Sequence, residues 1–173
     1  MNEDKALLSK ITTFIFDYDG VMTDGTVYMD SNGAPLRTSN VKDGYALQLA
    51  SKLGYHVAVI SGAIVTNITK RLNSLGVKDV FTGAADKVEV LVEYMQQCQL
   101  SPEQIAFMGD DIPDLRVMQK VGVPACPADA AEEVKAISRF ISDRKGGCGC
   151  VRDLIEQTLK VQGKWLSAEA YSW

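Results

Sequence analysis

Short apolar runs of strand length alternate with segments of helical periodicity along most of this chain, and this alternation is the feature that most restricts its fold. The runs rich in β-branched and aromatic residues predict strands at Ile11–Phe16, Tyr55–Ile60, Val80–Thr82, Ile105–Met108, Val123–Cys126 and Phe140–Ile141. Helical periodicity predicts helices at Asp43–Leu53, Ile64–Leu75, Asp86–Cys98, Leu115–Val121, Glu132–Ile137 and Val151–Val161. Because strands that alternate with helices pair in parallel, the sequence predicts an α/β fold: a Rossmann-like open parallel sheet with helices on both faces.

One segment breaks the alternation directly after the first predicted strand. Residues Thr26–Met29 and Ala34–Ser39 flank Asp30–Gly33, whose Asn-Gly pair is typical of a hairpin turn. We therefore expect a β-hairpin flap at residues 26–39. The chain contains no internal repeat and no linker-like composition, so residues 1–173 are predicted to form a single domain with a C-terminal tail at 164–173.

The overall charge excludes some partners. The chain has 22 acidic and 18 Lys or Arg residues, a formal net charge of −4, whereas binding to a nucleic-acid backbone needs concentrated positive charge. No apolar run is long enough to cross a membrane, and Met1–Lys10 lacks the apolar core of a signal peptide. The four cysteines do not have zinc-site spacing. We expect a cytoplasmic protein with neither nucleic acid nor membrane as its partner.

Polar residues follow four of the predicted strands. Asp17–Asp24 follows the first strand, Ser61-Gly62 the second and Gly109–Asp114 the fourth, while Lys87 begins the helix after the third. In an open parallel sheet, ligands bind beyond the carboxyl ends of the strands. Each of these patterns alone is more typical of a turn or a solvated loop, but their occurrence at four strand ends predicts one site.

Phosphoryl transfer requires this set of groups. Magnesium prefers oxygen ligands, and Asp17 and Asp110 offer carboxylates. Lys87 and the Ser61 hydroxyl offer partners for the charged phosphoryl oxygens. An aspartate beside a cation and a phosphate can attack phosphorus, which makes Asp17 the candidate nucleophile. Asp19 is suited to protonate the leaving oxygen and then to accept a proton from water.

At these residues the sequence resembles the haloacid dehalogenase superfamily of phosphatases. Its motifs occur here in order: Asp-x-Asp-Gly-x-x-x-Asp at Asp17–Asp24, a serine at Ser61, a lysine at Lys87, and Gly-Asp-Asp with a further aspartate at Gly109–Asp114. The resemblance implies Mg²⁺ as the cofactor, bound by Asp17, Asp19 and Asp110, with Asp111 and Asp114 supporting these ligands. It implies catalytic roles for Asp17, Asp19, Ser61 and Lys87.

Within that superfamily, the chain is most similar to the capless 3-deoxy-D-manno-octulosonate 8-phosphate phosphatases. The likeness includes Asn40–Tyr45, Gly146-Gly147, Val151-Arg152 and Val161–Lys164. The resemblance implies hydrolysis of a phosphorylated sugar acid in lipopolysaccharide precursor synthesis. It also implies a homotetramer in which neighbouring subunits supply the lid and the tail. The substrate contacts that it implies are Asp19, Asn40, Val41, Lys42, Asp43, Gly44, Gln48, Gly62, Arg71 and Lys87.

Two positions depart from that family pattern. Ala63 and Cys148 stand where the family usually has arginine, so the substrate carboxylate loses two candidate partners. Lys42, Lys70, Arg71 or a residue of a neighbouring subunit are the candidates to replace them. Three alternatives stay open: a phosphatase for a nine-carbon keto-sugar-acid 9-phosphate, a non-catalytic binding module, and a response-regulator receiver that is phosphorylated without turnover.

Overall fold

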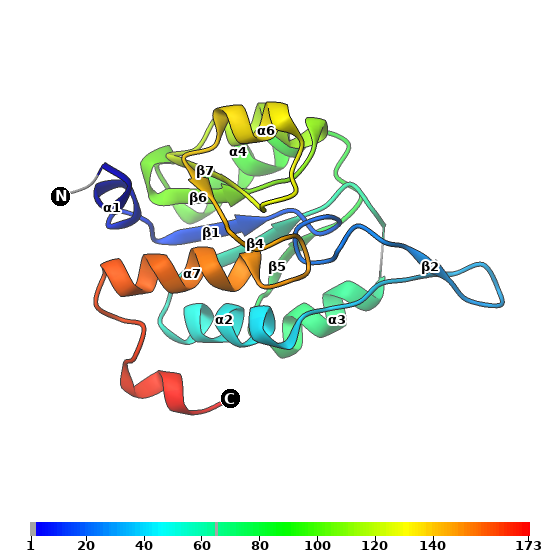
Figure 1. Cartoon of the computed structure of the whole chain (residues 1–173), viewed down its shortest axis with the longest axis horizontal. Coiled ribbons are helices and arrows are strands. Elements are labelled where there is room, and N and C mark those ends of the chain that lie inside the picture. Colours follow the sequence, from blue (N-terminus) through cyan, green and yellow to red (C-terminus); the bar gives the residue numbers. More distant parts are fainter. Residues whose placement is uncertain (1–2, 65) are drawn as a thin grey trace.

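The computed structural model describes residues 3–64 and 66–173 and contains a six-stranded parallel sheet (Figure 1). The strand order is β5-β4-β1-β6-β7-β8, so the first strand lies inside the sheet. The strands are β1 (Thr13–Phe16), β4 (His56–Ile60), β5 (Asp79–Phe81), β6 (Ile105–Met108), β7 (Val123–Cys126) and β8 (Phe140–Ile141). Every strand predicted for the sheet is present, which confirms the predicted α/β fold.

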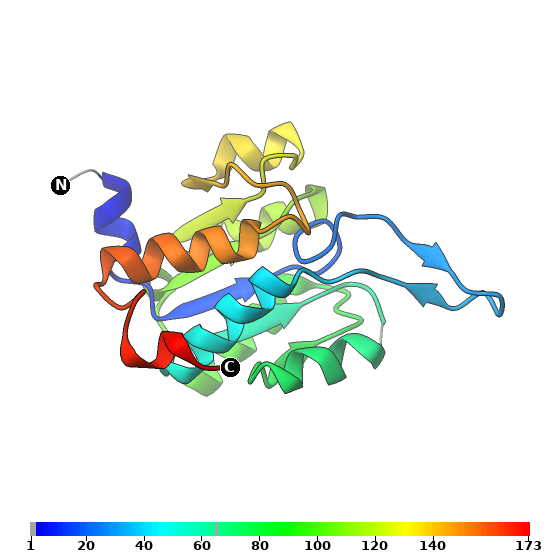
Figure 2. The same ribbon diagram turned by 60° about the horizontal axis from the view of Figure 1, so that its bottom comes forward.

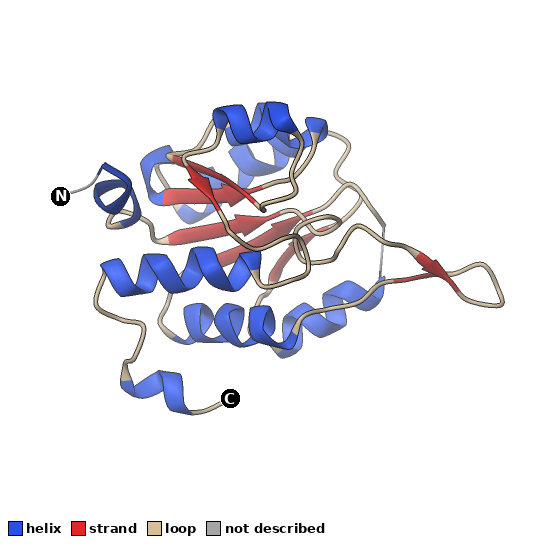
Figure 3. Ribbon diagram, viewed as in Figure 1, coloured by secondary structure: helices blue, strands red, loops and turns tan. Residues whose placement is uncertain are grey.

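Helices cover both faces of the sheet, as Figure 3 shows. They are α1 (Glu3–Leu8), α2 (Val41–Lys52), α3 (Thr66–Ser74), α4 (Lys87–Cys98), α5 (Leu115–Met118), α6 (Glu132–Ile137) and α7 (Cys150–Val161), with 3-10 turns η1 (Pro102–Gln104), η2 (Ile112–Asp114) and η3 (Ala168–Tyr171). Side chains of a strand alternate between its faces, so Phe14 and Phe16 pack with α2 and α7 while Ile15 packs with α4, α5 and α6. Among the described residues, no helix is both long and apolar enough to span a bilayer.

The strand register aligns the carboxyl ends of the central strands. Residues Thr13–Phe16 pair with His56–Val59 on one side and with Ile105–Met108 on the other. Just beyond β1, the amide of Asp17 donates to the carbonyl of Met108 at 2.9 Å. Consequently, the residues that follow these strands leave the sheet at the same level and converge on one edge.

The predicted hairpin is present and projects from that same edge (Figures 1 and 2). Its strands, β2 (Tyr28–Met29) and β3 (Pro35–Leu36), are antiparallel and shorter than predicted. In the turn, Asp30 Oδ1 accepts hydrogen bonds of 2.8 Å from the amides of Asn32 and Ala34. The side chains of both short strands are exposed, so the hairpin has no core of its own.

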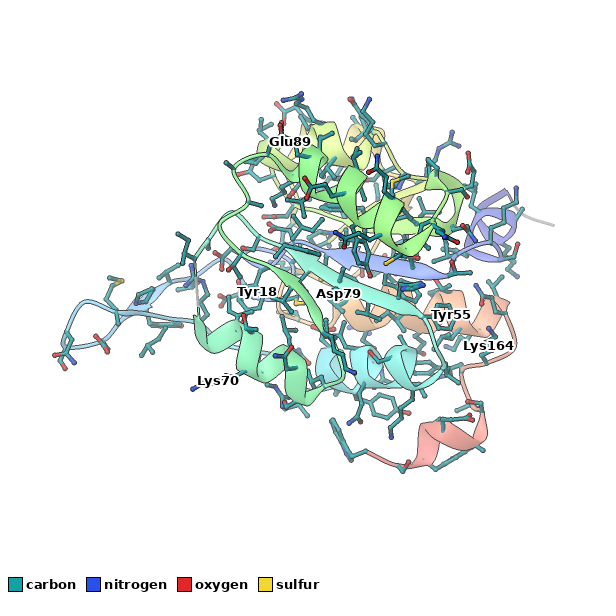
Figure 4. The ribbon with its side chains drawn as sticks, turned by 180° about the vertical axis from the view of Figure 1, so that it is seen from behind. Tyr18, Tyr55, Lys70, Asp79, Glu89 and Lys164 are labelled. Atoms are coloured by element: carbon teal, nitrogen blue, oxygen red, sulfur yellow. The ribbon has the colours of Figure 1, made fainter. Side chains whose placement is uncertain are left out.

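The C-terminal tail folds back on helix α2 of its own chain. That neighbouring subunits supply the tail stays a prediction. Tyr45 of α2 contacts Trp165 and Trp173 edge-on and donates a 2.6 Å hydrogen bond to the carbonyl of Ala170. The Lys164 ammonium donates to the Tyr55 hydroxyl at 3.2 Å. Figure 4 shows Lys164 and Tyr55 far from Tyr18, which lies near the hairpin.

Candidate active site

A cavity of about 350 Å³ lies at the edge of the sheet where the strands end. All the residues predicted for catalysis and metal binding line it, together with the glycines of the first loop. The lining residues are Asp17, Asp19, Gly20, Gly25, Ser61, Gly62, Ala63, Lys87, Asp110, Asp111, Pro113 and Asp114. The four separate sequence patterns therefore form one site, as the fold prediction required.

Lys87 occupies the centre of this site. It is the first residue of α4, which Asp86 caps by accepting from the amide of Val88 at 2.8 Å. Its ammonium lies 2.8 Å from Asp17 Oδ1 and 2.6 Å from Asp114 Oδ1, and all three side chains are largely buried. Burial lowers the pKa of Lys87, but the charges of Asp114 and Asp17 outweigh it and raise the pKa above its usual value. The lysine is a fixed cation at pH 7.

Three carboxylates cluster beside Lys87. One oxygen each from Asp17, Asp110 and Asp114 lies within 4.8 Å of the others. Burial, reinforced by Asp114, raises the pKa of Asp17 to about 6. Burial, reinforced by Asp17 and Asp114, raises the pKa of Asp110 to about 7. Carboxylates that repel one another in a buried place need a cation, and an all-oxygen set is suited to Mg²⁺. The donor set therefore fits the expected cofactor.

The carboxylate of Asp19 lies apart from this cluster and pairs with an arginine of the hairpin segment. Nε of Arg37 donates to Oδ1 of Asp19 at 2.5 Å, and Nη2 donates to Oδ2 at 2.9 Å. The sequence motifs did not indicate Arg37, because nothing local links it to a residue eighteen positions earlier. The one available signal was its place in a hairpin that follows the nucleophile loop.

Close backbone contacts hold the loops of the site together. A Cβ atom on Gly20, whose φ is +84°, would lie 1.9 Å from Oδ2 of Asp110. A Cβ atom on Gly146 would lie 1.9 Å from the carbonyl oxygen of Gly20. On Gly109 it would lie 2.5 Å from the Cβ of Asp114. The glycines are therefore required by packing, and Gly146 ties the loop before α7 to the loop after β1.

Ser61 and Asp111 lie on the loops after β4 and β6, respectively. Ser61 is buried, and its hydroxyl oxygen accepts from the amide of Ala63 at 3.2 Å. Its own O–H remains available as a donor. Asp111 is exposed and accepts from the amide of Ile112 at 2.8 Å, which begins the turn that carries Asp114.

The expected substrate-binding residues of α2 separate into different environments. Asn40 caps α2 and donates from Nδ2 to the carbonyl of Gly147 at 3.0 Å. Asp43 is buried and accepts from the amide of Arg152 at 2.7 Å, so it joins α2 to α7. Gln48 is half-buried, and its Oε1 has no hydrogen-bond partner among the described residues. Val41 is exposed.

Two of the cations expected to bind the substrate carboxylate, Arg71 and Lys42, lie outside the catalytic cavity. Arg71 of α3 lies beside Gly44 and lines a cavity of about 140 Å³ that Tyr18 and Arg37 also line. Lys42 instead lines a separate cavity of about 580 Å³ together with Arg152. The structure thus brings Arg71 close to the Asp17–Asp19 loop and places Lys42 on another surface.

Comparisons with known proteins show the family of this chain. The family model for haloacid dehalogenase-like hydrolases matches residues 60–151. The chain is 33% identical to 3-deoxy-D-manno-octulosonate 8-phosphate phosphatase KdsC of Escherichia coli K12 over 167 residues, which is 96% of this chain and 89% of the relative.

Solved structures of phosphatases from this family are similar to nearly the whole chain. The crystal structure of the phosphatase of that name from Yersinia pestis has a TM-score of 0.93 and 33% identity, over 96% of this chain and 90% of its own. The Moraxella catarrhalis phosphatase, solved with magnesium, phosphate and KDO, has a TM-score of 0.91 and 31% identity, over 94% of both chains. With its motifs gathered in one cavity, this chain belongs to the haloacid dehalogenase-like hydrolases, in the group that contains the 3-deoxy-D-manno-octulosonate 8-phosphate phosphatases.

Proposed function

We propose that this chain is a magnesium-dependent phosphatase that converts 3-deoxy-D-manno-octulosonate 8-phosphate to the free sugar acid and phosphate. The observation that carries the proposal is the placement of the Lys87 ammonium between Asp17 and Asp114, beside Asp110, in a cavity at the ends of parallel strands. Membership of the hydrolase family disfavours the receiver and binding-module alternatives.

In the first half of the reaction, a carboxylate oxygen of Asp17 attacks phosphorus. The bond from phosphorus to the sugar oxygen breaks as the new bond forms, and Asp19 gives its proton to that leaving oxygen. Lys87 and the Ser61 hydroxyl hold the remaining phosphoryl oxygens, where negative charge must be neutralised. Asp17, Asp110 and the residues around them would hold Mg²⁺, which neutralises phosphoryl charge when bound.

The second half releases phosphate. A water molecule attacks phosphorus of the aspartyl-phosphate, Asp19 takes the proton of that water, and Asp17 is restored as a carboxylate. Lys87 keeps its place while Asp17 is phosphorylated, because its salt bridge to Asp114 persists. Asp114 thus acts by holding Lys87 and by accepting from the amide of Asp110 at 3.1 Å.

The sugar acid itself requires a cation for its carboxylate. We assign that contact to Arg71, because it lines the cavity next to Tyr18, the residue between Asp17 and Asp19. Ala63 lines the catalytic cavity where the family pattern usually has arginine, so this wall is smaller and uncharged. That observation makes a nine-carbon keto-sugar-acid 9-phosphate the second candidate substrate.

Assembly is part of the proposal. The hairpin exposes Val27, Tyr28, Met29 and Leu36, and a two-stranded hairpin is marginal on its own in water. Pairing with hairpins of other subunits would bury these side chains, so we propose a homotetramer of single-domain subunits in which neighbours cover the cavity. The four cysteines are unpaired, in keeping with a cytoplasmic enzyme.

A panel of phosphate esters tests the function. It includes the eight-carbon 8-phosphate, the nine-carbon 9-phosphate and a generic aryl phosphate, each assayed with magnesium and with a chelator. We expect magnesium-dependent release of phosphate, with the highest kcat/KM for the eight-carbon substrate. A preference for the nine-carbon ester would select the second candidate, and no turnover of any ester would refute the proposal. Sedimentation of the Met29→Lys variant tests assembly, which we expect it to weaken.

A further inference from the structure

Arg37 binds the carboxylate of Asp19 through two parallel hydrogen bonds, from Nε to Oδ1 and from Nη2 to Oδ2. A two-point contact of this kind fixes the orientation of a carboxylate, whereas a single ammonium contact leaves it free to rotate. The side chain of Arg37 is only 9% exposed, and that of Asp19 is 34% exposed. The pair is therefore partly shielded and differs from an ordinary surface salt bridge.

The surroundings of Arg37 place it next to the reacting groups. It directly follows β3, so the hairpin carries it, while Asp19 belongs to the loop after β1. Its remaining nitrogen, Nη1, is buried and has no hydrogen-bond partner among the residues that the structure describes. Arg37 also lines the cavity shared with Tyr18 and Arg71. The two N–H groups of Nη1 thus stay available as donors beside the space assigned to the sugar acid.

We propose that Arg37 is a positioning residue that holds Asp19 in the orientation for proton transfer, so that the hairpin takes part in the chemistry as well as in covering the site. The inference rests on the proposed function. As the bond between phosphorus and the leaving oxygen breaks, the Asp19 proton passes to that oxygen, and the later attack of water returns a proton to Asp19. Each carboxylate oxygen that accepts from Arg37 keeps a second lone-pair direction for this transfer.

The role predicts a dependence on the leaving group. A sugar or alkyl oxygen is a poor leaving group and needs its proton, whereas 4-nitrophenolate leaves without one. The parameter kcat/KM reports the steps up to departure of the leaving group. A misaligned Asp19 should therefore reduce kcat/KM for a neutral sugar phosphate, which has no carboxylate for Arg37 to contact, much more than for 4-nitrophenyl phosphate.

Two variants of Arg37 and one control test this. Arg37→Met removes the charge and both hydrogen bonds to Asp19. Arg37→Lys keeps the charge but cannot form the two parallel hydrogen bonds. Arg139→Met removes an exposed arginine that precedes β8 and so lies at the opposite, amino-terminal edge of the parallel sheet. For Arg37→Met we expect kcat/KM to fall about 100-fold on the neutral sugar phosphate and less than about fivefold on 4-nitrophenyl phosphate, within the range of general acid catalysis. Arg37→Lys should give an intermediate ratio, and Arg139→Met a ratio like that of the wild type.

The outcomes separate this inference from the proposed function. Wild-type turnover of both esters supports the function, and the ratio of the two losses tests Arg37. Equal losses on both esters, or no loss in either Arg37 variant, would overturn the positioning role while leaving the phosphatase in place. If Arg37→Met unfolds, as circular dichroism would show, Arg37→Lys alone decides by the same ratio. A wild-type protein without turnover would overturn both.

Discussion

Gly20 and Asp110 lie so close together that a methyl group on Gly20 would overlap a carboxylate oxygen of Asp110, at 1.9 Å. The two residues belong to loops after β1 and β6, strands that are neighbours in the sheet. The predicted metal ligand Asp110 thus packs directly against the backbone of the loop after β1. The glycine of the Asp-x-Asp-Gly motif is required there because a side chain would not fit.

Gly20→Ala should therefore impair the site more than the fold. We expect weaker magnesium binding and a loss of activity of about 100-fold, because Asp110 must move, together with roughly 1–3 kcal/mol of strain from the positive φ. Gly54→Ala is the matched control, since Gly54 has a φ of +80° with nothing within 4 Å of the added atom. It should show similar strain with unchanged kcat/KM. Equal activity losses in the two variants would contradict the contact.

Removal of magnesium should make stability depend on pH. The pKa values of Asp17 and Asp110 are raised to about 6 and about 7 in the fold, so both groups oppose folding once they ionise. Their contribution to stability is present below the unfolded pKa of about 4 and is lost as pH rises through 6 to 7. In chelator, Tm should fall between pH 5 and pH 8, and added magnesium should raise Tm more at pH 8. The same magnesium effect at both pH values would count against the cluster as the metal site.

Asp43 should make a separate contribution to this pH dependence. Burial raises its pKa to about 6, although the amide of Arg152 stabilises the ionised form. Its contribution to the free energy of unfolding is fully present below pH 4. About 3 kcal/mol of that free energy is lost as pH rises through about 6. In Asp43→Asn, urea unfolding should therefore show a weaker decline between pH 4.5 and pH 7. Asp143→Asn, which removes an exposed carboxylate, should retain the wild-type decline.

The tail should stabilise the fold without taking part in catalysis. Truncation after Gly163 removes the edge-on contacts of Trp165 and Trp173 with Tyr45, and should reduce the free energy of unfolding by at least about 2 kcal/mol. Tyr45→Phe removes only the 2.6 Å hydrogen bond to Ala170 and should cost about 1 kcal/mol. Both variants should keep the wild-type kcat/KM at a temperature where they are folded. A rise in KM without loss of stability would show instead that the tail binds substrate.

Most of the fold follows from local sequence pattern. The sheet strands are short apolar runs buried on both sides, such as β1 and β6, and such runs are distinct from the longer periodic helices. The rule that ligands bind beyond the strand ends then brought Asp17, Ser61, Lys87 and Asp110 to one cavity. Helix α1 was not predicted, because its apolar residues are the consecutive Ala6–Leu8 and show no helical spacing.

Contacts between distant segments could not be read in the same way. Arg37 reaches Asp19 only because the hairpin folds back over the loop after β1, and Tyr45 meets Ala170 across 125 positions of the chain. The expected substrate-binding residues also lie in different environments, which the sequence pattern did not indicate. Arg71 lies beside the site, whereas Asp43 is enclosed between α2 and α7 and Lys42 faces another cavity. Residues that are adjacent in a helix point in different directions, which a motif does not record.

The covalent role of Asp17 is the central claim, and rapid acid quenching tests it most directly. The enzyme is mixed with magnesium and substrate labelled with radioactive phosphorus, quenched within one turnover and digested. We expect an acid-stable, hydroxylamine-sensitive phosphoryl group on the peptide that contains Asp17, and none in Asp17→Asn, whose activity should fall by several powers of ten. Label on another peptide, or an Asp17→Asn variant that keeps more than about one hundredth of the wild-type rate, would contradict the account.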